Sequence, residues 1–128
     1  MNGYLLDTHT AIWFFNGSDE LSKTAKQIIK DFSNSVFLSI TSAWELAIKI
    51  GIGKMKFNGK STGFLQLAEK CEIRILPIKA AHLTVFENLP HIHKDPFDRL
   101  IIASALAEQM TLITDDDNIA RYDVPIIW

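Results

Sequence analysis

The feature that most constrains the fold of this chain is a helix start at Asp95. Asp95 is a favourable N-cap residue, Pro96 suits the first helical position, and Asp98 falls in the first turn. Residues 100–107 are apolar apart from one serine, so we expect this helix to be buried on more than one side. Residues three and four apart are neighbours on a helix, so Asp98 shares a face with the isoleucines of this run. The helix therefore carries a carboxylate on a face that points to the core.

The position of Asp98 has two interpretations. An acid in the first turn of a helix is stabilised by the helix dipole, and a partly exposed Asp98 would need no further partner. A buried carboxylate instead needs a cation, a proton or a helix terminus, and such acids can mark functional sites. The helix by itself does not distinguish the two interpretations.

Short apolar strands alternate with helical segments along the chain. We expect strands at residues 4–6, 35–39, 73–76 and 111–114, with a last edge strand within 124–128. We expect helices at residues 8–15, 21–32, 43–50 (capped by Thr41 or Ser42), 64–71, 80–88, 96–107 and 118–122. This alternation predicts a single α/β domain over residues 1–128, with a central, mainly parallel sheet of four to five strands flanked by helices.

Composition narrows the class of protein further. With 128 residues and 48% hydrophobic residues, the chain can build one core, and no apolar run approaches the ~18 residues of a membrane span. The single cysteine, Cys71, excludes an internal disulfide and fits the reducing cytoplasm. The net charge of −2 does not indicate a nucleic-acid binder, so a polyanionic partner would need a local basic patch or metal ions.

Acidic residues follow several of the predicted strands. Asp7 ends the first strand, Glu45 lies just after the second, residues 115–117 are three aspartates after the fourth, and Asp98 begins the helix before the fourth. Ligands of parallel sheets bind beyond the carboxyl ends of the strands, near the point where the strand order reverses. The sequence therefore predicts that these acids converge on one edge of the sheet.

Each of these acids also has a structural explanation. Asp7 could cap the helix that follows it. Glu45 has capping-box spacing from Ser42 and is an i,i+4 partner of Lys49. Residues 115–117 could begin a short helix, although three acids are more than a cap needs. We favour one shared site, because four separate explanations at one edge are less economical than one.

Clustered carboxylates raise one another's pKa unless a cation neutralises them. Oxygen ligands suit Mg²⁺ or Mn²⁺ better than zinc, and such ions can activate water and stabilise charge in phosphoryl chemistry. The chain has no glycine-rich P-loop and no Asp-x-Asp after the first strand, which argues against nucleoside triphosphate binding and aspartyl-phosphate chemistry.

Three further features have open interpretations. Four lysines and no acid occupy residues 49–60, either as a solvated face or as a rim that contacts phosphate. His91 and His93 could be metal ligands, but two histidines without a third ligand favour solvent or substrate contact. The aromatic residues 13–15 could pack in the core, or could help the first two helices form a surface for a dimer or a partner.

Four motifs together resemble the PIN domain and, within it, the VapC-type toxin ribonucleases of bacterial toxin–antitoxin pairs. The motifs are Leu-Leu-Asp-Thr-His at 5–9, Ser-Ala-Trp-Glu at 42–45, His-Lys-Asp-Pro-Phe-Asp-Arg-Leu-Ile-Ile-Ala at 93–103 and Thr-Leu-Ile-Thr-Asp-Asp at 111–116. They cover essentially the whole chain in order. The Asp-Pro-Phe-Asp-Arg segment with its apolar helix is the most specific of the four.

The resemblance implies a Mg²⁺- or Mn²⁺-dependent endoribonuclease toxin that forms a homodimer and is inhibited by a small antitoxin. Its catalytic and metal-binding acids would be Asp7, Glu45, Asp98 and Asp116, and its supporting residues Thr8 and Thr114. The choice of Asp116 among the three consecutive aspartates rests on the resemblance alone. Lys49, Lys54 and Arg99 are the candidates for RNA contact. The alternatives are a PIN nuclease of RNA processing outside any toxin pair, and a non-catalytic PIN-fold binding module.

Overall fold

The computed structural model describes residues 3–128, so the first two residues of the predicted 1–128 domain lie outside the described range. The described chain forms a five-stranded parallel sheet in the order β3-β2-β1-β4-β5. The strands are β1 (Tyr4–Leu6), β2 (Val36–Ser39), β3 (Arg74–Leu76), β4 (Thr111–Ile113) and β5 (Ile126–Ile127). The predicted α/β class is confirmed, and β5 is the predicted edge strand.

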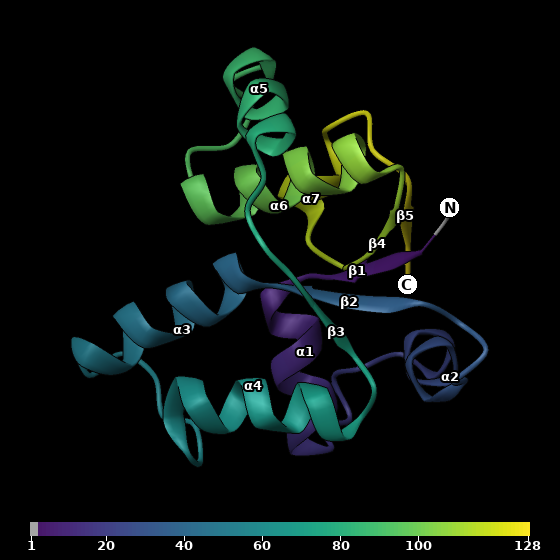
Figure 1. Cartoon of the computed structure of the whole chain (residues 1–128), viewed down its shortest axis with the longest axis vertical. Coiled ribbons are helices and arrows are strands. Elements are labelled where there is room, and N and C mark those ends of the chain that lie inside the picture. The colour runs from purple at the N-terminus through teal and green to yellow at the C-terminus, as the bar shows by residue number, and fades with distance from the viewer. Residues whose placement is uncertain (1–2) are drawn as a thin grey trace.

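Helices cover both faces of the sheet. They are α1 (Thr8–Asn16), α2 (Lys23–Lys30), α3 (Ile40–Gly51), α4 (Lys60–Lys70), α5 (Ala80–Asn88), α6 (Pro96–Glu108) and α7 (Asp117–Ala120). Figure 1 shows α1 to α4 on one side of the sheet and α5 to α7 on the other. Because both faces of a parallel sheet are covered, its strands are apolar on both sides rather than alternating.

Neighbouring residues of β1 belong to different cores. Leu6 packs with residues of α1 to α4 in one buried cluster, whereas Leu5 packs with residues of α6 and α7 in the other. Both leucines are fully buried. Successive side chains of a strand point to opposite faces, so β1 (Tyr4–Leu6) lies between the two cores and contributes side chains to both.

The helix predicted to start at Asp95 forms as expected. Asp95 caps α6 by accepting hydrogen bonds from the backbone N–H groups of Phe97 and Asp98, at 2.8 and 3.2 Å. Such a cap contributes about 1 kcal/mol to helix stability. Residues 99–105 are buried without exception, so the predicted burial on more than one side is confirmed.

Several helix bounds were predicted wrongly. The fourth helix was expected at residues 64–71, but α4 begins four residues earlier, at Lys60. The second helix was expected to reach Phe32, but α2 ends at Lys30 and Phe32 is 70% exposed. The third helix was expected to be capped by Thr41 or Ser42, whereas Ser39 caps it, with its hydroxyl accepting from the Thr41 N–H at 3.0 Å. Ser39 ends a buried strand, so strand and cap share one residue, and the helix starts at Ile40 rather than at residue 43.

Within residues 3–128, no helix has both the length and the apolar character that crossing a membrane requires.

Candidate active site

The predicted acids gather where the parallel strands end. Asp7 directly follows β1 and Asp116 comes three residues after β4, and these two strands are neighbours in the sheet. The chain continues from β1 towards β2 and β3 on one side, and β4 and β5 lie on the other, so β1 and β4 flank the point where the strand order reverses. Ligand sites of open α/β sheets form at that point.

Asp7 is buried and has two hydrogen-bond donors. Its Oδ1 accepts from the Thr8 N–H at 2.7 Å, which makes it the N-cap of α1, and its Oδ2 accepts from the Thr114 hydroxyl at 2.9 Å. Its relative exposure is only 4%. The cap interpretation and the site interpretation of Asp7 are therefore compatible, because one carboxylate oxygen serves the helix and the other faces the end of β4.

Glu45 is held from two sides. The Thr8 hydroxyl donates to Oε1 at 2.8 Å, and the Lys49 ammonium donates to Oε2 at 2.8 Å. The i,i+4 ion pair is thus confirmed, but the capping box with Ser42 was wrong. Ser42 lies inside α3, where its hydroxyl is 2.8 Å from the Thr8 Oγ1. Thr8 therefore connects the end of β1 to the buried face of α3.

Asp116 and Asp98 are the other two predicted acids, and each stands at the start of a helix. The Thr114 hydroxyl accepts from the Asp116 N–H at 3.1 Å, and Asp116 Oδ1 accepts from the Asn118 N–H at 2.9 Å as the cap of α7. Asp98 stands in the first turn of α6, with its Oδ2 2.9 Å from His93 Nε2. Thr114 thus contacts both Asp7 and the backbone of Asp116.

The acids affect one another's protonation. Burial, and then the charge of Asp98, raises the pKa of Asp7 to about 7, against the opposing hydrogen bond from Thr114. Burial raises the pKa of Asp98 to about 6, and among its smaller causes are the charges of Glu45 and Asp116. Asp7, Glu45, Asp98 and Asp116 therefore form one electrostatically connected group, as their predicted convergence requires.

The chain supplies little positive charge to this group. Lys49 pairs with Glu45, and this contact raises the pKa of its ammonium. His9 opposes the raised pKa of Asp7 only as a minor effect. The four carboxylates therefore carry more negative charge than the nearby side chains neutralise. Because they offer only oxygen ligands, they fit a hard divalent cation such as Mg²⁺ or Mn²⁺.

Within the described residues, one group of three side chains already has its ligand atoms within 4.8 Å of one another. It consists of His93, Asp95 and Asp98. Only Asp98 belongs to the predicted acid set. From the sequence, His93 is only a weak candidate metal ligand. Its place beside Asp98 has no sequence signature, because the contact spans five residues and a helix start.

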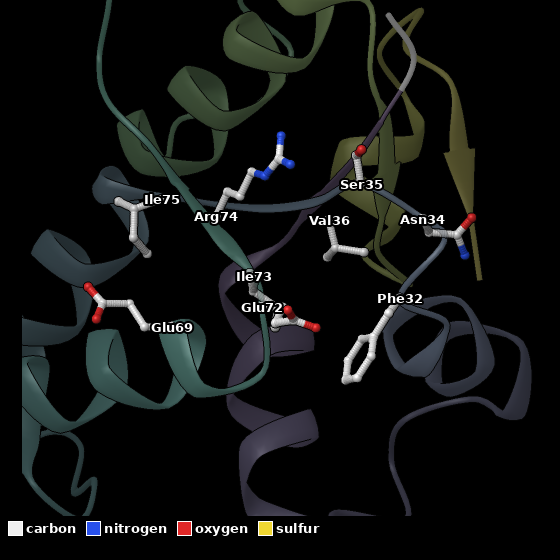
Figure 2. Close-up of a pocket in the computed structure, with 9 residues that line it drawn as sticks. All are labelled: Phe32, Asn34, Ser35, Val36, Glu69, Glu72, Ile73, Arg74 and Ile75. Atoms are coloured by element: carbon white, nitrogen blue, oxygen red, sulfur yellow. The ribbon is translucent and has the colours of Figure 1, made fainter.

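Two pockets show that size does not identify the site. Asp7, Asp116, His9 and Trp13 line a pocket of about 230 Å³ at the carboxyl edge. A pocket of about 550 Å³ lies instead where β2 and β3 begin, and Figure 2 shows its side chains coming from those strand starts and from the ends of α2 and α4. The larger pocket contains none of the four acids.

The candidates for RNA contact differ in availability. Lys54 is exposed in the turn after α3, and Lys56 and Lys60 are exposed nearby. Lys49 is engaged by Glu45. Arg99 is 7% exposed, donates to the Leu89 carbonyl at 3.3 Å and lies over the Phe86 ring at 4.7 Å. This burial argues against a contact between Arg99 and RNA.

Residues 4–125 match the PIN domain family, and the chain therefore belongs to that family. The comparison with curated proteins gave no match.

Solved structures with the same fold include toxin–antitoxin complexes. VapBC2 from Rickettsia felis, bound to a DNA fragment from its promoter, aligns with a TM-score of 0.73 at 20% identity, over 100% of this chain and 99% of that chain. DNA-bound VapBC from Salmonella typhimurium aligns with a TM-score of 0.70 at 16% identity, over 99% and 98%. A toxin–antitoxin complex from Klebsiella pneumoniae aligns with a TM-score of 0.68 at 20% identity, over 98% and 97%.

Proposed function

We propose that this PIN domain is a Mg²⁺- or Mn²⁺-dependent endoribonuclease and the toxin of a toxin–antitoxin pair. The observation that carries the proposal is the group of four acids at the carboxyl edge of the sheet. The hydroxyl of Thr8 contacts Glu45 and that of Thr114 contacts Asp7 and the Asp116 backbone, while Asp98 is coupled to the group through its charge. A pure RNA binder would gain nothing from four negative charges, which argues against a non-catalytic module.

Asp7, Glu45, Asp98 and Asp116 would hold the cation, which when bound supplies activated water and neutralises charge on the scissile phosphate. The chain's own contribution is orientation. Thr114 fixes one oxygen of Asp7, and Thr8 fixes one oxygen of Glu45. Buried hydroxyl donors of this kind keep carboxylates in one geometry and so avoid reorganisation during the reaction.

We assign RNA contact to the exposed lysines in the loop after α3 and at the start of α4. Lys54, Lys56 and Lys60 lie within a stretch of seven residues without an acid. Their ammonium groups would contact phosphates on either side of the cleavage site. Lys49 would act first on Glu45, with which it is paired, and only indirectly on RNA.

The proposed partner is a small antitoxin, because the structural neighbours are toxin–antitoxin complexes. The main alternative is a PIN nuclease of RNA processing without such a partner, and a small reading frame directly upstream would distinguish the two. Expression with and without that partner should arrest growth only in its absence. A toxin of this kind would act in the cytoplasm, where its RNA substrate is.

We also propose a homodimer, formed through α3 and α5. Trp44, Ile48 and Ile52 lie four residues apart on one face of α3 and are all exposed, Trp44 at 55% and Ile52 at 61%. Leu83 of α5 is exposed as well and lines an apolar pocket with Trp44. A continuous apolar surface of this kind is typical of protein contacts. Residues 13–15 are half-buried against the core between α1 and α4, so they offer less free surface.

Ile48→Glu is expected to convert a dimer into a monomer, because it places a charge within the apolar face of α3. Light scattering across a range of concentrations measures this change. Phe32→Glu is the matched control, since Phe32 is equally apolar and more exposed but lies beyond α2. A wild-type protein that is monomeric at every concentration would contradict the proposed dimer.

Metal dependence tests the proposed activity directly. We expect RNA cleavage by the purified protein to need Mg²⁺ or Mn²⁺ and to stop in EDTA. We also expect millimolar Mn²⁺ to raise the melting temperature by mass action, and Asp98→Asn to reduce that rise. Undiminished cleavage in EDTA, or a melting temperature indifferent to both ions, would refute the proposal.

A further inference from the structure

We infer that His93 is a positioning residue that orients the Asp98 carboxylate for cation binding. This inference rests on the proposed function. Its basis is the contact between His93 Nε2 and Asp98 Oδ2, at 2.9 Å. An ionised carboxylate can only accept a hydrogen bond, so the imidazole carries its proton on Nε2 and donates it. Asp98 Oδ1 is then left for the cation.

The segment that carries His93 is fixed in place by contacts from other elements. The backbone N–H groups of Ile92 and His93 both donate to the hydroxyl of Tyr122, at 3.3 and 2.9 Å. Tyr122 is buried, with 5% exposure. At the start of the same segment, the buried Arg99 donates to the Leu89 carbonyl. His93 is therefore presented to Asp98 by a backbone held at both ends.

Asp98 has few other means of orientation. Thr8 and Lys49 hold Glu45, and Thr8 and Thr114 hold Asp7, so each of these acids has two donors. Among the hydrogen bonds of the described residues, the Asp98 carboxylate has only the one from His93. The Asp98 N–H is used separately, on the cap residue Asp95. Without His93, rotation of the Asp98 side chain would be restricted only by packing.

Hydrogen-bonded partners of ligand side chains commonly contribute 10- to 100-fold to metal affinity, because they fix ligand orientation. His93 could instead bind the cation itself, since its ligand atom lies within 4.8 Å of those of Asp95 and Asp98. The geometry favours positioning, because Nε2 is already engaged by Asp98 and Asp95 Oδ1 already caps α6. A hard cation also prefers oxygen to imidazole nitrogen.

The experiment compares His93→Ala and His93→Gln by Mn²⁺ titration of the metal-free, full-length protein, without RNA. Glutamine keeps an N–H donor near the place of Nε2 but removes the imidazole. We expect His93→Ala to weaken Mn²⁺ binding by about 10- to 100-fold and His93→Gln to restore most of it. His91→Ala is the matched control, because His91 is exposed and stands two residues earlier. Circular dichroism of each metal-free variant checks the fold.

Three outcomes would overturn the inference. Unchanged affinity in a folded His93→Ala protein would show that Asp98 needs no positioning partner. Equal losses in folded His93→Ala and His93→Gln would make His93 a ligand instead. A wild-type protein that does not bind Mn²⁺ would overturn the proposed function together with this inference, whereas the first two outcomes leave the proposed function intact.

Discussion

Asp7→Asn protein is expected to cleave RNA at least about 100-fold more slowly than the wild type in single-turnover reactions. The loss is comparable to removing one major transition-state interaction. Asparagine keeps the shape of the side chain, and its oxygen can still accept from the Thr8 N–H. The amide nitrogen takes the place of the oxygen that accepts from the Thr114 hydroxyl, and it can only donate to that hydroxyl. The substitution therefore removes one negative charge, keeps the hydrogen bond from the Thr8 N–H and reverses the one with Thr114.

Lys54→Ala provides the contrast to this result. Lys54 is exposed and lies outside the acid group, so we expect weaker RNA binding, a salt dependence reduced by about one phosphate contact, and an unchanged cleavage rate at saturating protein. Circular dichroism checks that both variants are folded. Full activity of folded Asp7→Asn protein would exclude Asp7 from the reaction and the proposed mechanism with it.

The second large effect concerns stability without metal. The pKa of Asp7 is about 7 in the folded chain against an ordinary value of 3.8, so the folded state holds its proton more tightly than the unfolded state. The free energy of unfolding should therefore be highest below about pH 4 and fall as the pH rises to about 7. The raised pKa of Asp98 acts in the same direction. For Asp7, the rise in pKa from 3.8 to about 7 corresponds to ~4 kcal/mol at most.

Asp7→Asn should remove most of this decline. In EDTA, we expect the variant to be as stable as the wild type near pH 4 and more stable by up to ~4 kcal/mol at pH 8. Urea denaturation at several pH values measures the difference. Asp19→Asn, at an exposed position, is the control and should leave the pH profile unchanged. A wild-type protein whose stability rises from pH 5 to pH 8 in EDTA would contradict the raised pKa values of Asp7 and Asp98.

The hydrophobic pattern determined the secondary structure and the class of fold. Tyr4–Leu6 and Thr111–Ile113 are short apolar runs that only a sheet covered on both faces can bury, and both are strands. Asp95 and Pro96 fixed the start of α6, because capping depends on a few adjacent residues. The end of α2 and the starts of α3 and α4 were less predictable, because packing decides which of several possible residues begins or ends a helix.

The sequence also determined that the acids would meet, since parallel strands place their carboxyl ends on one edge. Only the tertiary structure decided how each acid is held. Thr8 contacts Glu45 across 37 residues and Thr114 contacts Asp7 across 107 residues. The contact from Tyr122 to the segment that carries His93 spans 29 residues. Local preference sets which elements form, whereas partners at such separations depend on how the elements pack, which no short stretch of sequence encodes.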